Sequence, residues 1–143
     1  MPRLDPYESL AFHCNLTFRA WVAALEDRLK GTKVSPAQVL ALAHLTALGP
    51  LSQSALSNLL SITHVTTVRL VDRMERDGWV TRQPDPDDGR ANLVVLTAEA
   101  VNAWEELSQT VRAMLDQAYR GIHPSEIETV KRVLERVRRN IGA

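Results

Sequence analysis

Apolar residues recur at helical spacing along most of the chain, so the pattern predicts a mainly α-helical fold. Residues 5–30 form the first helical stretch. Its apolar face comprises Leu10, Cys14, Phe18, Trp21, Leu25 and Leu29. A second helix is predicted to begin at Ser35, because serine is a good N-cap, Pro36 fits a first helical turn, and Gln38 can reach back to the cap. A Gly-Pro pair ends this helix, since proline cannot continue it.

Two shorter helical patterns follow, separated by a brief break. Ser52 begins the first, which extends to about Leu60, and Thr63 begins the second, which extends to Asp77. The residues of the second helix expected to face the core are Thr67, Leu70, Val71 and Met74. Its opposite face carries His64, Val65, Thr66, Arg69, Asp72 and Arg73. Such a face of small polar side chains, one valine and arginines can enter a DNA major groove without steric conflict.

A β-hairpin is predicted directly after these helices. Two short β-type runs, residues 79–82 and 93–96, flank a turn at residues 85–90 that is rich in Pro, Asp and Gly. Arg90 lies at the tip of this hairpin. Helix, turn, helix and a hairpin with an arginine at its tip together predict a winged helix–turn–helix, whose target is duplex DNA.

Two long helices are predicted after the hairpin, the first of them capped by Thr97. Their apolar residues step alternately by three and four positions: Trp104, Leu107, Val111, Met114 and Ala118, then Ile127, Val130, Leu134, Val137 and Ile141. This spacing is typical of a coiled-coil seam. Such stripes exceed what one small domain needs for its own core, so we expect the terminal helices to pack against a second copy of the chain.

The expected fold class is therefore mainly α with a small β-hairpin wing. Residues 1–143 form one domain in this interpretation, with a winged-helix DNA-binding lobe at 35–97. Helical dimerisation regions at 5–30 and 98–141 flank that lobe.

The length and composition suit an ordinary soluble domain. The chain has 143 residues, of which 45% are hydrophobic and 24% charged, so disorder is not expected. No apolar run approaches the 18 residues that a membrane span needs, and the first residues lack a signal-peptide pattern. We therefore expect a cytoplasmic protein with no membrane partner.

No motif indicates an enzyme or a bound cofactor. Nucleophile–base spacings, a phosphate loop and paired catalytic carboxylates are all missing from the sequence. The four histidines are scattered without the spacing of a zinc site, and the single cysteine excludes intramolecular disulfides and thiolate metal cages. Enzymatic activity, a metal and a cofactor are therefore not expected.

The charge counts mildly against a nucleic-acid partner, because the net charge is zero. Residues 61–97, the expected reading region, carry five arginines against six acids. DNA affinity must then come from the placement of a few arginines. We expect modest affinity for one protomer and a dimer that binds more tightly. Arg69 and Arg73 are weaker candidates, because each can instead pair with Asp72 or Glu75.

Four consecutive segments carry recognisable motifs. They are residues 35–42 (SPAQVLAL), 51–56 (LSQSAL), 71–80 (VDRMERDGWV) and 85–90 (DPDDGR) with the Leu-Thr pair at 96–97. In this order and spacing they resemble the MarR family of bacterial transcriptional regulators over nearly the whole chain. The resemblance implies a triangular homodimer whose terminal helices form the interface, and regulation of nearby genes that a small ligand often relieves. Ala100 departs from the usual glycine, a change that a helix tolerates.

The resemblance also implies roles for individual residues. His64 and Thr66 match positions that contact base edges, and Arg90 matches the wing-tip arginine that reaches a minor groove. Asp88 matches the aspartate that orients the wing, expected to act by pairing with an arginine such as Arg82. The full expected DNA-binding set is Ser52, Gln53, Thr63, His64, Val65, Thr66, Arg69, Arg73, Arg82, Asp88 and Arg90.

Each of these assignments has a plainer alternative. Arg90 can be a solvated turn charge, although a helix–turn–helix just before it favours a contact with the narrow, negative minor groove. His64 can simply face solvent instead of donating to a guanine edge or a phosphate. Val65 has no structural reason to lie on a polar face, and a thymine methyl group would supply one.

The family resemblance raises two further hypotheses. Some relatives sense hydroperoxides with a cysteine near the start of the first helix, where Cys14 lies, but no tyrosine of the next helix is present to support a thiolate. The apolar face favours a core cysteine instead. A ligand pocket is also implied, with the positions Phe12, His13, Leu16, His44 and Trp104 as its lining. An ordinary core or seam position is an equally good interpretation of these five residues.

Two classes of function remain open. The leading hypothesis is a dimeric, sequence-specific regulator, with repression as its expected action. Its partners would be an inverted-repeat operator in double-stranded DNA, a second copy of the chain, and a small-molecule effector. The alternative is a winged-helix module that docks protein without specific DNA binding, which the neutral charge and the acid-rich wing favour. Arg90 and the polar face of the second short helix favour DNA.

Overall fold

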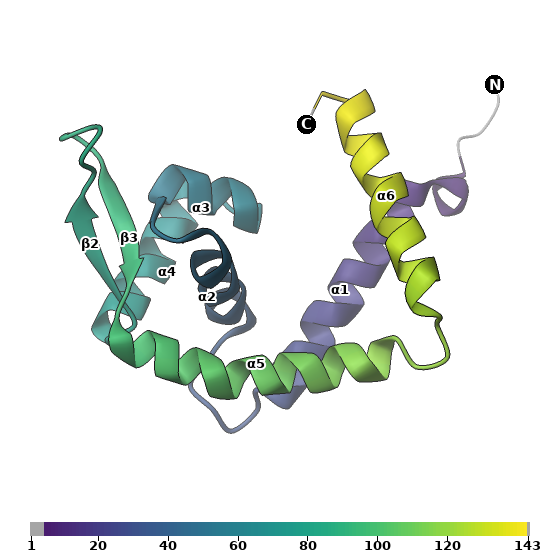
Figure 1. Ribbon diagram of the computed structural model, residues 1–143, viewed down its shortest axis with the longest axis horizontal. Coiled ribbons are helices and arrows are strands. Elements are labelled where there is room, and N and C mark those ends of the chain that lie inside the picture. The colour runs from purple at the N-terminus through teal and green to yellow at the C-terminus, as the bar shows by residue number, and fades with distance from the viewer. Residues whose placement is uncertain (1–4, 143) are drawn as a thin grey trace. The chain divides into compact units, whose positions relative to one another are not determined.

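The computed structural model describes residues 5–142, and most of them are helical (Figure 1). In chain order the elements are a 3₁₀ helix η1 (Pro6–Glu8), α1 (Leu10–Arg28), α2 (Pro36–Leu48), β1 (Leu51–Ser52), α3 (Gln53–Leu60), α4 (His64–Arg76), β2 (Val80–Pro84), β3 (Asn92–Leu96), α5 (Ala98–Ala118) and α6 (Pro124–Asn140). The mainly α fold with a small β wing is confirmed.

The chain divides into two compact units, one that ends at Val111 and one that begins at Arg112. The boundary falls inside α5, so the first unit contains η1, α1–α4, the sheet and the first part of α5. The second unit contains the end of α5 and α6. Within the described residues, none of the helices combines the length and apolar character needed to cross a membrane.

Local capping explains where the predicted helices begin. Ser35 Oγ accepts a hydrogen bond from Gln38 N at 3.3 Å, and Gln38 Oε1 accepts one from Ser35 N at 2.9 Å, which completes a capping box. Ser52 and Thr63 cap α3 and α4 with the side-chain oxygen alone, without the reciprocal bond of a capping box. Thr97 Oγ1 accepts from the third backbone amide beyond it at 3.1 Å, at the start of α5. These predicted helix starts are confirmed.

The predicted first helix is wrong at its start. Asp5 Oδ1 accepts a hydrogen bond from Tyr7 N at 2.9 Å and caps the short 3₁₀ helix. Ser9 then has extended backbone angles, φ −85° and ψ 125°, which interrupt the helical hydrogen bonds. The regular helix α1 therefore begins only at Leu10.

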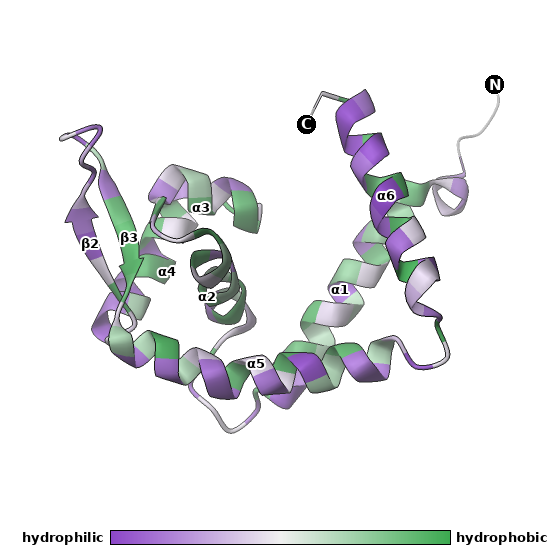
Figure 2. Cartoon of the chain, viewed as in Figure 1, coloured by the Kyte–Doolittle hydropathy of each residue, from purple (hydrophilic) through white to green (hydrophobic). Residues whose placement is uncertain are grey.

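The core of the first unit lies among α2, α3, α4 and the sheet. Leu42, Leu56, Val71, Met74 and Val94 have no exposed surface there. Figure 2 shows this concentration of apolar residues in α2 and β3, whereas polar residues cover the hairpin tip. The four residues of α4 predicted to face the core are all buried, which confirms the predicted orientation of this helix.

The predicted hairpin is confirmed and belongs to a three-stranded antiparallel sheet in the order β1-β3-β2. β3 pairs with β2 from Val80 opposite Leu96 to Pro84 opposite Asn92, and the tip extends away from the helices of its unit (Figure 1). Gly78 has a φ of +79° in the turn from α4 into β2, a backbone conformation that glycine adopts without steric cost. The hairpin is thereby joined to α4 by one tight turn.

A buried hydroxyl pair joins α3 to α4. Ser57 Oγ donates to Thr67 Oγ1 at 2.7 Å, and Thr67 Oγ1 donates to the Thr63 carbonyl at 3.0 Å. Thr67→Val keeps the shape of the side chain but removes both contacts, so it should lower the free energy of unfolding by about 1–3 kcal/mol. Urea unfolding followed by circular dichroism measures this change. The exposed Thr81→Val is the control and should stay within about 0.5 kcal/mol of wild type; equal losses in both variants would contradict the assignment.

Candidate nucleic-acid interface

The outer face of α4 is polar and open, opposite its buried residues. At helical spacing, Val65, Arg69, Asp72 and Arg76 form one stripe on this face. Val65 is 62% exposed, although burial is the usual outcome for valine. Its exposure places a methyl-bearing side chain between arginines and hydroxyl groups, as the sequence predicted.

The beginning of α4 holds its threonines in fixed positions. Thr63 Oγ1 accepts a hydrogen bond from Thr66 N at 3.2 Å, and the two hydroxyl groups lie 2.8 Å apart. Both residues are exposed, as is His64 between them. The cap therefore fixes the orientation of Thr66 while the side chain of His64 faces solvent.

Three arginines of this region are available for a partner. Within residues 5–142, the side chains of Arg69, Arg76 and Arg90 make no hydrogen bond or ion pair, and all three residues are exposed. Arg76 was not among the predicted contacts. Its position seven residues after Arg69 puts it on the same stripe, and this spacing is the signal that could have identified it.

The wing tip is shaped by its own aspartates. Asp88 Oδ1 accepts a hydrogen bond from Arg90 N at 3.0 Å, and Asp85 Oδ1 accepts one from Asp87 N at 2.9 Å. Backbone bonds from Asp85 N to the Ala91 carbonyl at 2.9 Å and from Ala91 N to the Asp88 carbonyl at 3.0 Å close the loop. The turn thus presents the side chain of Arg90 to solvent at the tip.

The predicted pairing of Asp88 with Arg82 is wrong. Arg82 binds Gln53 at the start of α3 and Asp72 and Glu75 in the second half of α4. Asp88 lies in the turn between β2 and β3 and binds the backbone amide of Arg90 instead. Arg82 is only 21% exposed. The sequence left open whether Arg69 pairs with Asp72 or Glu75. Both acids bind Arg82 instead, and Arg69 has no partner among the described side chains.

Arg73 faces a different part of the unit. Its Nη2 donates to the Lys33 carbonyl at 2.6 Å, and its Nε lies 3.8 Å from Asp77 Oδ2. Arg73 also lines a hollow of about 340 Å³ beside the loop between α1 and α2. Lys30 lines the same hollow, and its hydrogen bond with Asp27 raises the pKa of Lys30 and lowers that of Asp27.

The two remaining predicted DNA contacts, Ser52 and Gln53, make hydrogen bonds within the fold. Ser52 Oγ accepts from Ala55 N at 3.1 Å and caps the helix. Gln53 Oε1 accepts from Arg82 Nε at 3.2 Å and from Arg82 Nη2 at 3.0 Å. Both residues are half-buried, and each holds another group of the fold in place.

The five predicted ligand-binding residues have different local surroundings. Phe12 packs edge-on against Tyr7 with ring centroids 4.9 Å apart, and His13 Nε2 contacts the Tyr7 carbonyl at 2.7 Å. Leu16 is exposed, His44 is half-buried, and Trp104 packs against the core. Neither the hollow beside Arg73 nor the one on α6 contains any of them.

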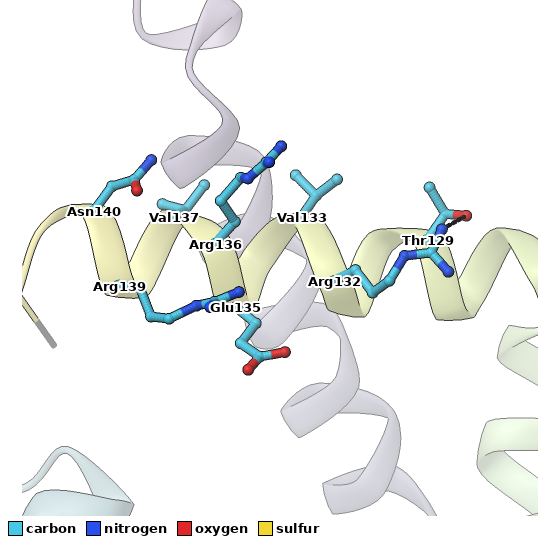
Figure 3. A pocket seen from close by; sticks show the side chains of 8 residues that line it. All are labelled: Thr129, Arg132, Val133, Glu135, Arg136, Val137, Arg139 and Asn140. Atoms are coloured by element: carbon cyan, nitrogen blue, oxygen red, sulfur yellow. Dashed lines mark hydrogen bonds between the residues drawn. The ribbon is translucent and has the colours of Figure 1, made fainter.

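A hollow of about 520 Å³ on α6 is lined only by residues of that helix, Thr129, Arg132, Val133, Glu135, Arg136, Val137, Arg139 and Asn140 (Figure 3). Because a single helix cannot enclose a ligand, this hollow is an open surface feature. Among residues 5–142, no three His, Cys, Asp or Glu side chains are gathered where they could hold a metal ion. Cys14 is a half-buried free thiol.

The chain is similar to known regulators in sequence and in fold. The family model described as MarR family matches residues 32–91. An HTH-type transcriptional repressor, IacR of Pseudomonas putida, is 27% identical over 96 residues, which cover 67% of this chain but only 54% of that protein. The chain thus spans about half the length of this curated relative.

Two solved structures show the same fold. A MarR family transcriptional regulator from Silicibacter pomeroyi superposes with a TM-score of 0.88 at 24% identity and covers 99% of both chains. A mutant of MarR from E. coli, in complex with operator DNA, superposes with a TM-score of 0.75 at 24% identity, over 90% of this chain and 92% of that one.

Proposed function

We propose that this chain is a member of the MarR family, whose model matches residues 32–91, and that it regulates transcription by binding DNA as a homodimer. The observation that carries this proposal is the outer face of α4 together with the wing tip. Arg69 lies one helical turn after the exposed Val65 on α4, and Arg90 lies at the wing tip. Both arginines are exposed and without a partner among the described side chains, although the surrounding region has more acids than arginines. Unpaired arginines suit a phosphate backbone, and an exposed valine suits a base edge.

The proposed complex places α4 in the major groove and the wing tip in an adjacent minor groove. His64 and Thr66 would contact base edges, and Val65 would contact a thymine methyl group. Arg69 and Arg76 would bind phosphates, which position the protein without reading sequence. The fold of E. coli MarR, a protein solved with operator DNA, supports this arrangement.

Exposed apolar side chains support the dimer. On α6, Val130 is 53% and Val137 40% exposed, and Ile141 at its end is 75% exposed. Figure 3 shows Val133 and Val137 projecting from the same side of this helix. On α1, Leu10 and Phe18 are also exposed. Apolar stripes of this kind suit a self-complementary helical interface in a homodimer.

We further propose repression as the mode of regulation and a small molecule as the effector. The name of the P. putida relative, a transcriptional repressor, supports the first, and the family resemblance supports the second. The competing function, protein docking by the winged lobe, rests on the three aspartates of the wing turn, Asp85, Asp87 and Asp88. Two of these carboxylates accept hydrogen bonds inside the turn, which weakens the case for an acidic docking surface.

A mobility-shift assay of the full chain with the DNA that flanks its own gene tests the function. We expect a shifted complex that survives an excess of unrelated duplex and weakens as salt rises, because phosphate contacts release counterions. The assay is run at two salt concentrations with a scrambled duplex of equal length as the control. Equal binding to both duplexes, or binding to neither, would contradict sequence-specific regulation and favour the protein-docking alternative.

His64→Ala and Thr66→Ala should each relax base choice at one position of the site. Each substitution should weaken binding to the preferred duplex by about 1–3 kcal/mol and should change binding little on a duplex with a different base pair at that position. Binding to a set of duplexes with single base-pair changes measures both quantities. Arg76→Ala is the matched control and should weaken binding equally for all duplexes. An unchanged base preference in both His64→Ala and Thr66→Ala would show that these two side chains do not read bases.

A further inference from the structure

We propose that Arg82 is a positioning residue that holds the wing against the helix–turn–helix, and that it does not contact DNA. The inference deepens the proposed function, since it concerns how the two DNA-contacting parts are kept at a fixed spacing. It rests on the cluster formed by Arg82 of β2, Gln53 of α3, and Asp72 and Glu75 of α4, named here the Arg82 cluster.

Every nitrogen of the Arg82 guanidinium has an acceptor. Nε and Nη2 donate to Gln53 Oε1 at 3.2 and 3.0 Å, Nη2 also donates to Asp72 Oδ1 at 2.6 Å, and Nη1 donates to Glu75 Oε2 at 2.6 Å. The backbone amide of Arg82 donates to the other Glu75 oxygen at 3.3 Å. One side chain of the wing thus binds both helices of the helix–turn–helix, and little donor capacity is left for a phosphate.

The chemistry of this cluster requires arginine. A planar guanidinium presents donors in several fixed directions, so it can bind three side chains at once, whereas the compact ammonium group of lysine cannot span them. Asp72 and Glu75 are one helical turn apart and would repel each other without the cation between them. The side chain of Arg82 is mostly buried, which strengthens charge-assisted hydrogen bonds relative to exposed ones.

The position of the cluster explains why it would matter for binding. Arg82 lies opposite Val94 near the middle of the β2–β3 pairing, whereas Arg90 lies beyond the ends of both strands. A small rotation of the hairpin at Arg82 therefore displaces the wing tip by more than it displaces the strand. The DNA contacts of α4 and of Arg90 at the wing tip can reach the same duplex only if the hairpin keeps its angle to α4.

The electrostatics of the region fit the same assignment. If Asp72 and Glu75 were free surface carboxylates, they would repel the phosphate backbone, and neutralising them would raise DNA affinity. In this structure the two carboxylates instead hold an arginine that belongs to the wing. The apparent excess of acid in the reading region is therefore partly internal to the fold.

Arg82→Ala and Arg82→Lys separate the two possible roles. If Arg82 positions the wing, the lysine variant should lose DNA affinity nearly as much as the alanine variant, by about the severalfold factor that Arg90→Ala alone would cause. A direct phosphate contact would instead make lysine behave like wild type, because lysine keeps the charge. Circular dichroism and sedimentation select variants with wild-type helix content and assembly, and Glu75→Gln serves as a milder variant with the same expected direction.

A double-mutant cycle with Arg90→Ala gives the sharper result. Arg90→Ala should reduce affinity severalfold in the wild-type background but less than twofold in the Arg82→Lys background, because the wing tip is already out of place. Equal factors in the two backgrounds would overturn the proposal. Asp87→Asn is the matched acidic control and should strengthen binding, whereas Glu75→Gln should weaken it. A gain in affinity for Glu75→Gln would also overturn the proposal.

Hydrogen exchange supplies a measurement that does not depend on DNA. Backbone amides of β2 and β3 should exchange faster in Arg82→Lys than in wild type, while the amides of α2 stay unchanged. Unchanged exchange in the wing would contradict the positioning role. If the wild-type chain binds no DNA, the proposed function fails, and this exchange measurement still decides whether Arg82 holds the wing.

Discussion

Val130→Arg combined with Val137→Arg is expected to convert the protein into a monomer with greatly weakened DNA binding. Both valines are exposed on one face of α6 and belong to the predicted seam, so two arginines there would bring like charges together across a self-complementary interface. Loss of the second reading lobe removes the gain from bivalent binding. The apparent affinity for a two-half-site duplex should therefore fall by about 10²–10⁴-fold.

Sedimentation equilibrium at micromolar concentration measures the assembly, and a titration of labelled duplex measures the affinity. Glu135→Arg on the opposite face of α6 is the control and should remain dimeric with wild-type affinity. Removal of the chain from Ser125 onward should likewise give a monomer or an insoluble product. If the wild-type chain sediments as a compact, soluble monomer, the proposed interface is wrong.

Arg90→Ala is expected to weaken binding to every DNA sequence and to reduce its dependence on salt. The side chain is exposed at the wing tip and makes no hydrogen bond or ion pair with the described residues, while its backbone amide is held by Asp88. Its contact with a minor groove would be driven by charge and carry little base information. The slope of log affinity against log salt should fall by about one for each protomer.

Binding isotherms at several salt concentrations measure both effects, on the preferred duplex and on a scrambled one. Arg90→Lys is the control that keeps the charge, and it should preserve most of the salt slope. If Arg90→Ala leaves both the affinity and the slope unchanged while the fold stays intact, the wing does not contact DNA.

Local chemistry made much of the fold predictable from the sequence. The starts of α2, α3, α4 and α5 were predicted because each depends on a serine or threonine that binds the backbone within three residues. The hairpin was predicted because its turn composition and its strands lie within one short segment. These features need no information from distant parts of the chain.

Features that depend on distant contacts or on very short elements were missed. Strand β1 has only two residues and pairs with β3 across the sequence, so it is too short to show an alternating pattern. The first helix begins late because Asp5 caps a separate 3₁₀ turn, and apolar spacing does not reveal such a break.

The partners of Arg82 were the main error in the candidate site. Six acids lie between residues 61 and 97, and nothing in their spacing shows which of them tertiary packing will bring to a given arginine. In the structure Arg82 binds Glu75 and Asp72, which precede it by seven and ten residues, and the side-chain amide of Gln53, which precedes it by 29. Arg69 remains unpaired because Asp72 and Glu75 bind Arg82 instead, and this outcome could not be predicted from the spacing of the charges.

A chemical footprint of the wild-type chain and of Arg90→Ala on one bound duplex tests the central claim most directly. Dimethyl sulfate reports guanine N7 in the major groove, and hydroxyl radicals report the minor-groove side of the backbone. We expect two inverted half-sites about one helical turn apart, each with major-groove protection beside a minor-groove protection that disappears in Arg90→Ala. A minor-groove pattern identical in the two proteins, or a wild-type footprint without major-groove protection, would contradict that claim.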